Sequence, residues 1–131
     1  MGFLSAHFEK IYAGTRILAG LMFMFHGLQK VLGLFGGAPE GAPAFIQYGA
    51  GGIELVGGAL IAIGLFAAPA AFISSGTMAV AYFVAHQSKG AFPIQNGGEL
   101  AILYCWIFLM IAARGAGIWS VDGSKGENAA N

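Results

Sequence analysis

The sequence has too few charged residues for a soluble domain. Asp, Glu, Lys and Arg make up 9% of its 131 residues, whereas about a quarter of a typical soluble domain is charged. Hydrophobic residues make up 57%, and a chain of this length cannot bury them all in its own core. No Asp, Glu, Lys or Arg occurs between Leu55 and Ser88. The composition therefore argues against a soluble fold and predicts helices whose apolar side chains face lipid.

Cysteine, basic charge and cofactor-binding motifs are scarce as well. Cys105 is the only cysteine, which excludes an internal disulfide or a CxxC redox pair, and its deep position predicts an unreactive thiol. Six Lys and Arg balance six Asp and Glu, so no basic patch is available for a nucleic-acid backbone and we expect no nucleic-acid partner. The sequence contains no signature of a covalent or nucleotide cofactor.

The apolar residues form four segments. The first is long enough, at about 1.5 Å per residue, to cross an apolar core of about 30 Å. Pro69 is expected to break the long uncharged run because it lacks an N–H. We therefore predict one all-α domain over residues 1–131, an integral membrane bundle of four transmembrane helices. Their expected bounds are about 11–34, 45–66, 70–86 and 97–113, with a polar tail at 114–131.

Charge and glycine patterns refine this topology. Four crossings place both termini on one side, and cytoplasmic sides are enriched in Lys and Arg, so we expect cytoplasmic termini. That side holds Lys10, Arg16, Arg114 and Lys125, whereas the other holds only Lys30 and Lys89. Small residues let helix backbones approach closely, which predicts a central position for the second segment. It contains Gly49, Gly51, Gly52, Gly57 and Gly58.

Threading the segments alternately brings most ionisable residues to one membrane depth. At about 100° per residue, Arg16, His26 and Lys30 also share one face of the first segment. Ionisable groups at membrane depth cost at least ~2.5 kcal/mol each and are retained mainly where they pair or face a cavity. We therefore predict a polar, ligand-binding pocket in the outer leaflet. Its candidate residues are His26, Lys30, Glu54, His86, Asn96 and Glu99.

Simpler explanations exist for several of these residues. Lys30 and Arg16 could extend to the lipid headgroups. Glu99 could serve only as a helix cap, in an Asn-x-x-Glu pair, and His86 could lie in interfacial water. Glu54 is hardest to explain in this way, because it lies about two turns into its helix. Packing or lipid contact is expected for Met22, Met24, Met78 and Met110, rather than metal binding.

Four motifs cover nearly the whole chain. They are Arg16-x3-Gly20-x2-Phe23-x2-His26-Gly27-x2-Lys30; Gly52-x-Glu54 followed by Gly57-Gly58 and Gly64; Asn96-Gly-Gly-Glu99-Leu-Ala-x-Leu103-Tyr104; and Gly115-x-Gly117-x2-Ser120-Val-Asp122. Together they resemble the DoxX family of small four-helix bacterial membrane proteins. Two departures are Ala67-Ala68, where the family often has Thr-Arg, and Ala116, where it often has proline.

The resemblance implies a redox setting in a bacterial inner membrane. The family takes its name from a subunit linked to terminal quinol oxidation and thiosulfate-to-quinone electron transfer, and relatives associate with oxidative-stress enzymes. One hypothesis is that the pocket binds a quinone or small redox substrate, with a histidine bonding a carbonyl and a glutamate relaying protons. In a variant of this hypothesis, His26, Glu54, His86 and Glu99 bind a metal ion.

The alternative hypothesis is non-catalytic, and the sequence leaves open whether the chain is an enzyme. The chain could be an accessory subunit of a larger respiratory, photosynthetic or redox membrane complex. Its partners besides the lipid bilayer would then be other membrane subunits or a second copy of itself, docked on glycine-rich faces. A small-molecule permease is a third hypothesis, which would require oligomers to enclose a path.

Overall fold

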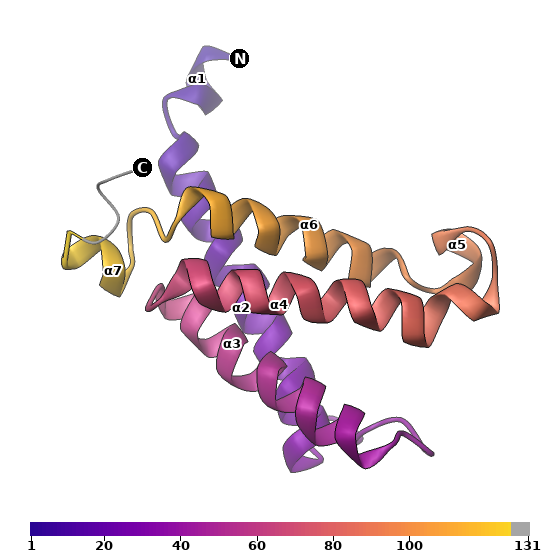
Figure 1. The fold of residues 1–131 in the computed structure, drawn as a ribbon. Helices are drawn as coiled ribbons and strands as arrows, with labels where there is room; N and C mark the ends of the chain where they lie inside the picture. The colour runs from indigo at the N-terminus through magenta and orange to yellow at the C-terminus, as the bar shows by residue number, and fades with distance from the viewer. Residues whose placement is uncertain (127–131) are drawn as a thin grey trace.

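The computed structural model describes residues 1–126, in which all regular structure is helical. The long helices are α2 (Phe8–Leu32), α3 (Gly51–Ile63), α4 (Ala67–Ala81) and α6 (Glu99–Arg114) (Figure 1). A π-helical segment, η1 (Phe45–Ala50), leads into α3. α4 continues into a second π-helical segment, η2 (Tyr82–His86), and a 3₁₀ turn, η3 (Gln87–Lys89). The short helices are α1 (Gly2–Ser5), α5 (Pro93–Asn96) and α7 (Val121–Ser124).

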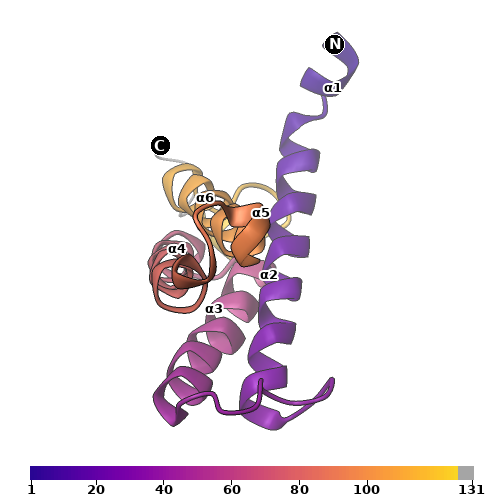
Figure 2. The same ribbon diagram turned by 90° about the vertical axis from the view of Figure 1, so that its right-hand side faces the viewer.

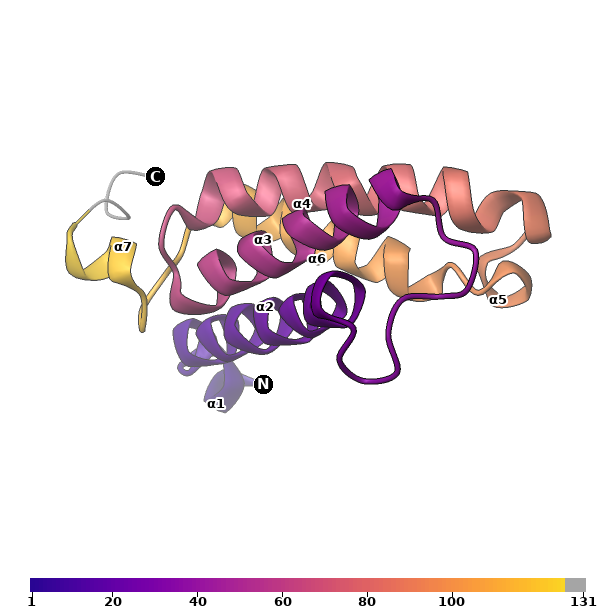
Figure 3. The same ribbon diagram turned by 90° about the horizontal axis from the view of Figure 1, so that it is seen from below.

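The long helices form two antiparallel pairs. α2 lies against α3, and α4 lies against α6 (Figures 1 and 2). α3 and α4 meet at the turn that joins them and diverge from it, so the two pairs are close at one end and apart at the other (Figures 1 and 2). The long connection from α2 to η1 lies at the end where the pairs are apart (Figures 2 and 3).

Three helical stretches are long and apolar enough to cross a membrane. They are Phe8–Leu32, Phe45–Ile63 and Ala67–Lys89, and they correspond to three of the four predicted segments. α6 has 16 residues, which gives a rise of roughly 24 Å against an apolar core of about 30 Å. The all-α membrane architecture is therefore confirmed, whereas a fourth crossing by α6 stays a prediction.

The turn between α3 and α4 differs from the prediction. Pro69 does not break the helix, because α4 already begins at Ala67. Gly64 and Phe66 make the turn instead, both with left-handed backbones at φ of 71° and 48°. Pro69 lies in the first turn of α4, where a backbone N–H has no partner within the helix, so proline costs little there.

The contact between α2 and α3 is a contact of backbones. A Cβ at Gly58 would lie 2.5 Å from the amide nitrogen of Met24, and one at Gly20 would lie 2.6 Å from that of Ala62. Only glycine permits this approach, which agrees with the expected central position of the second segment. The prediction is wrong for Gly49 and Gly52, since a Cβ at either would meet no described atom within 4 Å.

Candidate functional site

A cavity of about 970 Å³ lies between the two helix pairs, toward the end where they diverge. Its volume is at the upper end of the range for small-molecule sites, about 300–1,000 Å³. The walls come from α2, η1 with α3, α4 with η2, and α6. The connection from α2 to η1 contributes Ala38, Pro39, Ala42 and Pro43. Most of the lining is apolar. The charged, imidazole and phenol groups that line it are His26, Lys30, Glu54, His86, Lys89 and Tyr104.

Lys30 and Glu54 form an ion pair in the wall of this cavity. The distance from Lys30 Nζ to Glu54 Oε1 is 2.5 Å, and Glu54 is only 2% exposed. The second carboxylate oxygen, Oε2, is buried and has no hydrogen-bond partner within residues 1–126. The two helices lie close enough for this pair because Gly51 has no side chain: a Cβ there would lie 2.9 Å from the Lys30 Cβ. Lys30 therefore neutralises Glu54 and does not merely extend to the headgroups.

Tyr104 contributes a second buried polar atom that the sequence analysis missed. It is 4% exposed, and its hydroxyl has no partner in the described part of the chain. The His26 ring lies edge-on to it, with 6.3 Å between ring centroids. The buried residues of α6 are Ala101, Tyr104, Phe108 and Ile111. This helical spacing predicts the buried face of α6 and could have identified Tyr104 from the sequence.

The structure does not bring all six predicted residues together. His26, Lys30, Glu54 and His86 line the cavity, but Glu99 and Asn96 do not. Glu99 is exposed, and at about 100° per residue it lies nearly opposite Tyr104 on α6. The prediction grouped Glu99 with the cavity residues by its depth, but it did not account for the face of α6 on which Glu99 lies.

Asn96 is buried but is used within the chain. Its Oδ1 accepts a hydrogen bond from the Gly98 amide at 2.8 Å, and its Nδ2 donates to Tyr82 Oη and Gly90 O at 3.2 Å each. Gly98 is the N-cap of α6, so the expected Asn-x-x-Glu cap does not form. His86 Nδ1 lies 3.2 Å from the Asn96 carbonyl oxygen. Asn96 therefore fixes the loop beside the cavity.

The predicted metal alternative has no ligand set. Within residues 1–126, no three His, Cys, Asp or Glu side chains lie close enough to share a metal ion. The exposed position of Glu99 removes one of the four proposed ligands from the cavity.

The opposite end of the bundle is held by Arg16. Its side chain is fully buried and donates four hydrogen bonds to backbone carbonyl oxygens. Nη1 donates to Ile61 and Ala62, at the end of α3, at 2.7 Å each. Nη2 donates to Ile118 at 3.2 Å and Trp119 at 2.7 Å, beyond α6. The explanation of Arg16 as a headgroup contact is therefore wrong.

The segment after α6 is folded back onto the bundle. Asp122 is buried, and its two carboxylate oxygens accept hydrogen bonds from the Phe66 and Ala67 amides at 3.0 and 2.9 Å. A carboxylate at a helix N-terminus satisfies amides that lack helical partners and interacts favourably with the dipole. The predicted polar tail therefore packs on the bundle as far as Gly126, and its remainder lies outside the described residues.

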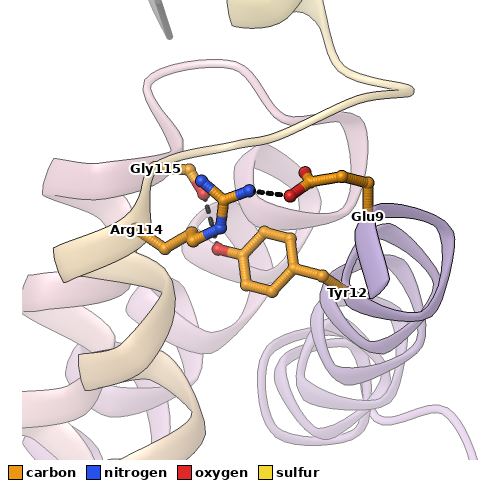
Figure 4. A network of polar contacts seen from close by, with 4 residues as sticks. All are labelled: Glu9, Tyr12, Arg114 and Gly115. Atoms are coloured by element: carbon orange, nitrogen blue, oxygen red, sulfur yellow. Dashed lines mark hydrogen bonds and ion pairs between the residues drawn. The ribbon is translucent and has the colours of Figure 1, made fainter. Parts of the chain in front are cut away.

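A polar contact also joins the start of α2 to the end of α6. The Tyr12 hydroxyl donates to the Gly115 carbonyl oxygen at 2.5 Å, and Arg114 forms an ion pair with Glu9 (Figure 4). The Arg114 guanidinium also lies 5.3 Å from the centre of the Tyr12 ring. Together with Arg16 and Asp122, these contacts connect α2, α3, α4 and α6 at one end.

Comparison with known proteins agrees with the membrane architecture. The DoxX family model matches residues 12–87. A protein of Haemophilus influenzae, described as an uncharacterized protein, is 45% identical over 118 residues, which cover 84% of this chain and 87% of the relative. The chain belongs to the DoxX family. No solved structure matches this DoxX chain.

The family match covers most of the cavity but not all of it. Residues 12–87 include four of the six charged, imidazole and phenol groups that line the cavity, His26, Lys30, Glu54 and His86, and also Arg16. Tyr104 lies beyond the matched residues, as does Asp122. The matched region therefore supplies the ion pair and both imidazoles, whereas α6 supplies the phenol that lies against the His26 ring.

Proposed function

We propose that this DoxX protein spans a bacterial inner membrane four times, with α6 as the fourth crossing and both termini in the cytoplasm. α6 lies beside α4, and it exposes Leu103 and Trp106, which are 58% and 66% exposed. Lipid is a suitable environment for such side chains. Cysteine labelling in intact cells tests the topology: in a Cys105→Ser background, an impermeant reagent should label Ala42→Cys and spare Ser124→Cys. Labelling of both positions, or only of Ser124→Cys, would contradict the orientation.

The cavity is proposed to bind the ring of a quinone in the outer leaflet, which gives the protein a redox-linked role. The observation that supports this is the pair of buried polar atoms without partners, Glu54 Oε2 and Tyr104 Oη, in a mainly apolar wall. A buried polar atom without a partner costs about 1–3 kcal/mol. A ligand that pairs with both atoms recovers this free energy on binding.

The residue types suit both redox states of such a ring. The Tyr104 hydroxyl can donate a hydrogen bond to a quinone carbonyl, and the Glu54 carboxylate can accept one from a quinol hydroxyl. His26 can do either, according to its tautomer. Lys30 Nζ donates a hydrogen bond to Glu54 Oε1 at 2.5 Å, which leaves Oε2 as the oxygen that can accept one from the ring. The quinone would supply the electron-carrying chemistry, and the chain would bind and orient it away from water.

Ligand binding by matched variants tests this proposal. Tyr104→Phe removes the donor to a quinone carbonyl, and Glu54→Gln replaces the carboxylate that accepts from a quinol hydroxyl. The first variant should weaken quinone binding and the second quinol binding, each about five- to tenfold, for a net loss of about 1 kcal/mol. Tyr48→Phe and Glu99→Gln are the controls, because neither residue lines the cavity. The measurement is equilibrium binding to purified protein, with extraction of quinone that co-purifies. Equal binding by all four variants would show that the cavity does not hold the ring.

A second candidate role is that of a non-catalytic subunit of a larger redox membrane complex. A groove of about 430 Å³ between α3 and α4 favours it, since Gly49, Gly52 and Gly57 line the groove beside Ser74. The Ser74 hydroxyl is fully buried and has no partner among the described residues. Small residues and a hydroxyl are typical of helix–helix contacts in membranes. Gly52→Leu should release a bound subunit or second copy, detected by native mass spectrometry, while quinone binding is retained.

A further inference from the structure

The quinone cavity extends from the interior of the bundle to the outer face of α4. Met78 lines it and is 7% exposed, as expected for a residue that faces the interior. Val80 and Val84 also line it, yet they are 62% and 60% exposed. These residues lie on different faces of one helix. The cavity therefore curves around the edge of α4 and opens beside it.

The opposite side of this opening belongs to η1. Phe45 lines the cavity and is 75% exposed, and α3 and α4 diverge toward this end (Figures 1 and 2). Gly76 on α4 also contributes to the rim, and a Cβ there would meet no described atom within 4 Å. We call the opening formed by Phe45, Gly76, Val80 and Val84 the side portal. No charged side chain belongs to it.

The chemistry of the side portal differs from that of the other rim. His86 and Lys89 lie where η2 and η3 leave the membrane-spanning stretch Ala67–Lys89, close to the loop that contains Asn96. Val80 lies well within the same stretch. In a bilayer, the polar rim would face headgroups and water, whereas the side portal would face hydrocarbon at Gly76 and Val80. Phe45 and Val84 lie nearer the interface, toward the ends of the stretches Phe45–Ile63 and Ala67–Lys89.

We propose that the ligand is dissolved in the membrane, carries a hydrocarbon tail and enters sideways through the side portal, where its tail stays after the ring has bound. This inference rests on the proposed quinone site and narrows its substrate class to tailed, lipid-soluble quinones. A tail at Val80 and Val84 remains in an apolar environment, whereas a water-soluble ligand would have to cross hydrocarbon to use this opening.

Portal variants and two ligands test the inference. The full chain in bilayer nanodiscs is titrated with a benzoquinone that carries an isoprenoid tail, and with the same ring without a tail. Val80→Trp fills the opening, so it should weaken binding of the tailed quinone at least about tenfold and leave the tail-less ring within about twofold. Leu103→Trp is the matched control on α6, because Leu103 is exposed and lines neither cavity. Lys89→Trp fills the polar rim at an exposed residue to which no bond with the ring is assigned, so it should leave the tailed quinone bound.

The possible results separate this inference from the quinone proposal. If the unsubstituted protein binds both ligands and Val80→Trp changes the affinity for neither, entry through the side portal is wrong and the proposed ring site is retained. If Lys89→Trp excludes the tailed quinone and Val80→Trp does not, the ligand enters from the polar rim and the inference is again wrong. If the unsubstituted protein binds neither ligand, the proposed quinone site itself fails.

Discussion

The two ends of this helix bundle use their buried polar groups differently. At the end formed by Arg16, the Gly64–Phe66 turn and residues 115–126, here the tied end, Arg16 and Asp122 are bonded to backbone atoms of other segments, and Arg16 Nε is their one side-chain nitrogen or oxygen without a partner among the described residues. At the end that contains the cavity, here the open end, Glu54 Oε2 and Tyr104 Oη lack partners among the described residues. Satisfied groups fix a fold, whereas unsatisfied ones leave capacity for a ligand. We infer that the tied end determines stability and the open end determines binding.

The largest expected effect is that of removing Arg16. Arg16→Ala leaves four carbonyl oxygens unpaired at the tied end, so it should destabilise the protein by about 3–5 kcal/mol. Arg16→Lys keeps the charge but cannot present a planar fork to four acceptors, so it should recover only part of the loss. Unfolding in detergent measures both. If Arg16→Ala unfolds at the same temperature as the unsubstituted protein, the tied end does not determine stability.

The next largest effect is expected at the contact between α2 and α3, which joins the two ends. Gly58→Ala places a Cβ against the backbone of α2, and overpacking of this kind costs about 1–3 kcal/mol. Gly52→Ala is the control, because a Cβ there would meet no described atom within 4 Å. Gly58→Ala should also weaken quinone binding, since separation of α2 from α3 moves Lys30 away from Glu54. Equal stability of the two variants would mean that this close contact is not required.

A smaller loss is expected for the cap at the start of α4. Asp122→Ala removes the acceptor of two amide hydrogen bonds, which should cost about 1–2 kcal/mol. Because Asp122 belongs to the tied end, quinone affinity should remain within about twofold of the original. Glu54→Gln is the reciprocal variant: it should weaken quinol binding, and because its amide oxygen can still accept from Lys30 it should lower the unfolding temperature less than Arg16→Ala does. If Asp122→Ala impaired binding as much as Glu54→Gln, the ends would not act separately.

The sequence predicted the elements well, because apolar runs and glycines act over short stretches of chain. Three spanning helices, the close approach of α2 to α3, and a buried Glu54 could be recognised from composition and spacing alone. Membrane depth was also assigned from the sequence, and it placed Lys30 near Glu54 correctly. These features depend on local hydrophobicity and on the small size of glycine, both of which are read directly from the residues.

The remaining features depend on rotation and on long-range contacts. Depth says nothing about which face of a helix a residue occupies, so Glu99 was included in the pocket and Tyr104 was not. The partners of Arg16 are backbone atoms about 45 and 102 residues away, and backbone acceptors leave no pattern in the sequence. The cap by Asp122 was missed for the same reason, because a carboxylate after the last apolar segment is typical of an ordinary polar tail.

The smallest effect is expected for the ion pair between Arg114 and Glu9, although it belongs to the tied end. The two side chains are 35% and 47% exposed, and exposed ion pairs contribute about 0–1 kcal/mol. Glu9→Gln should therefore lower stability only slightly. Most of this loss should disappear at high salt, because salt screens the ion pair in the unsubstituted protein. Arg114→Gln should cost somewhat more, since the guanidinium also lies 5.3 Å from the Tyr12 ring centre. Unfolding at low and high salt separates the two contributions. A loss as large as that of Arg16→Ala would mean that the surface contact, and not the buried guanidinium, holds the tied end together.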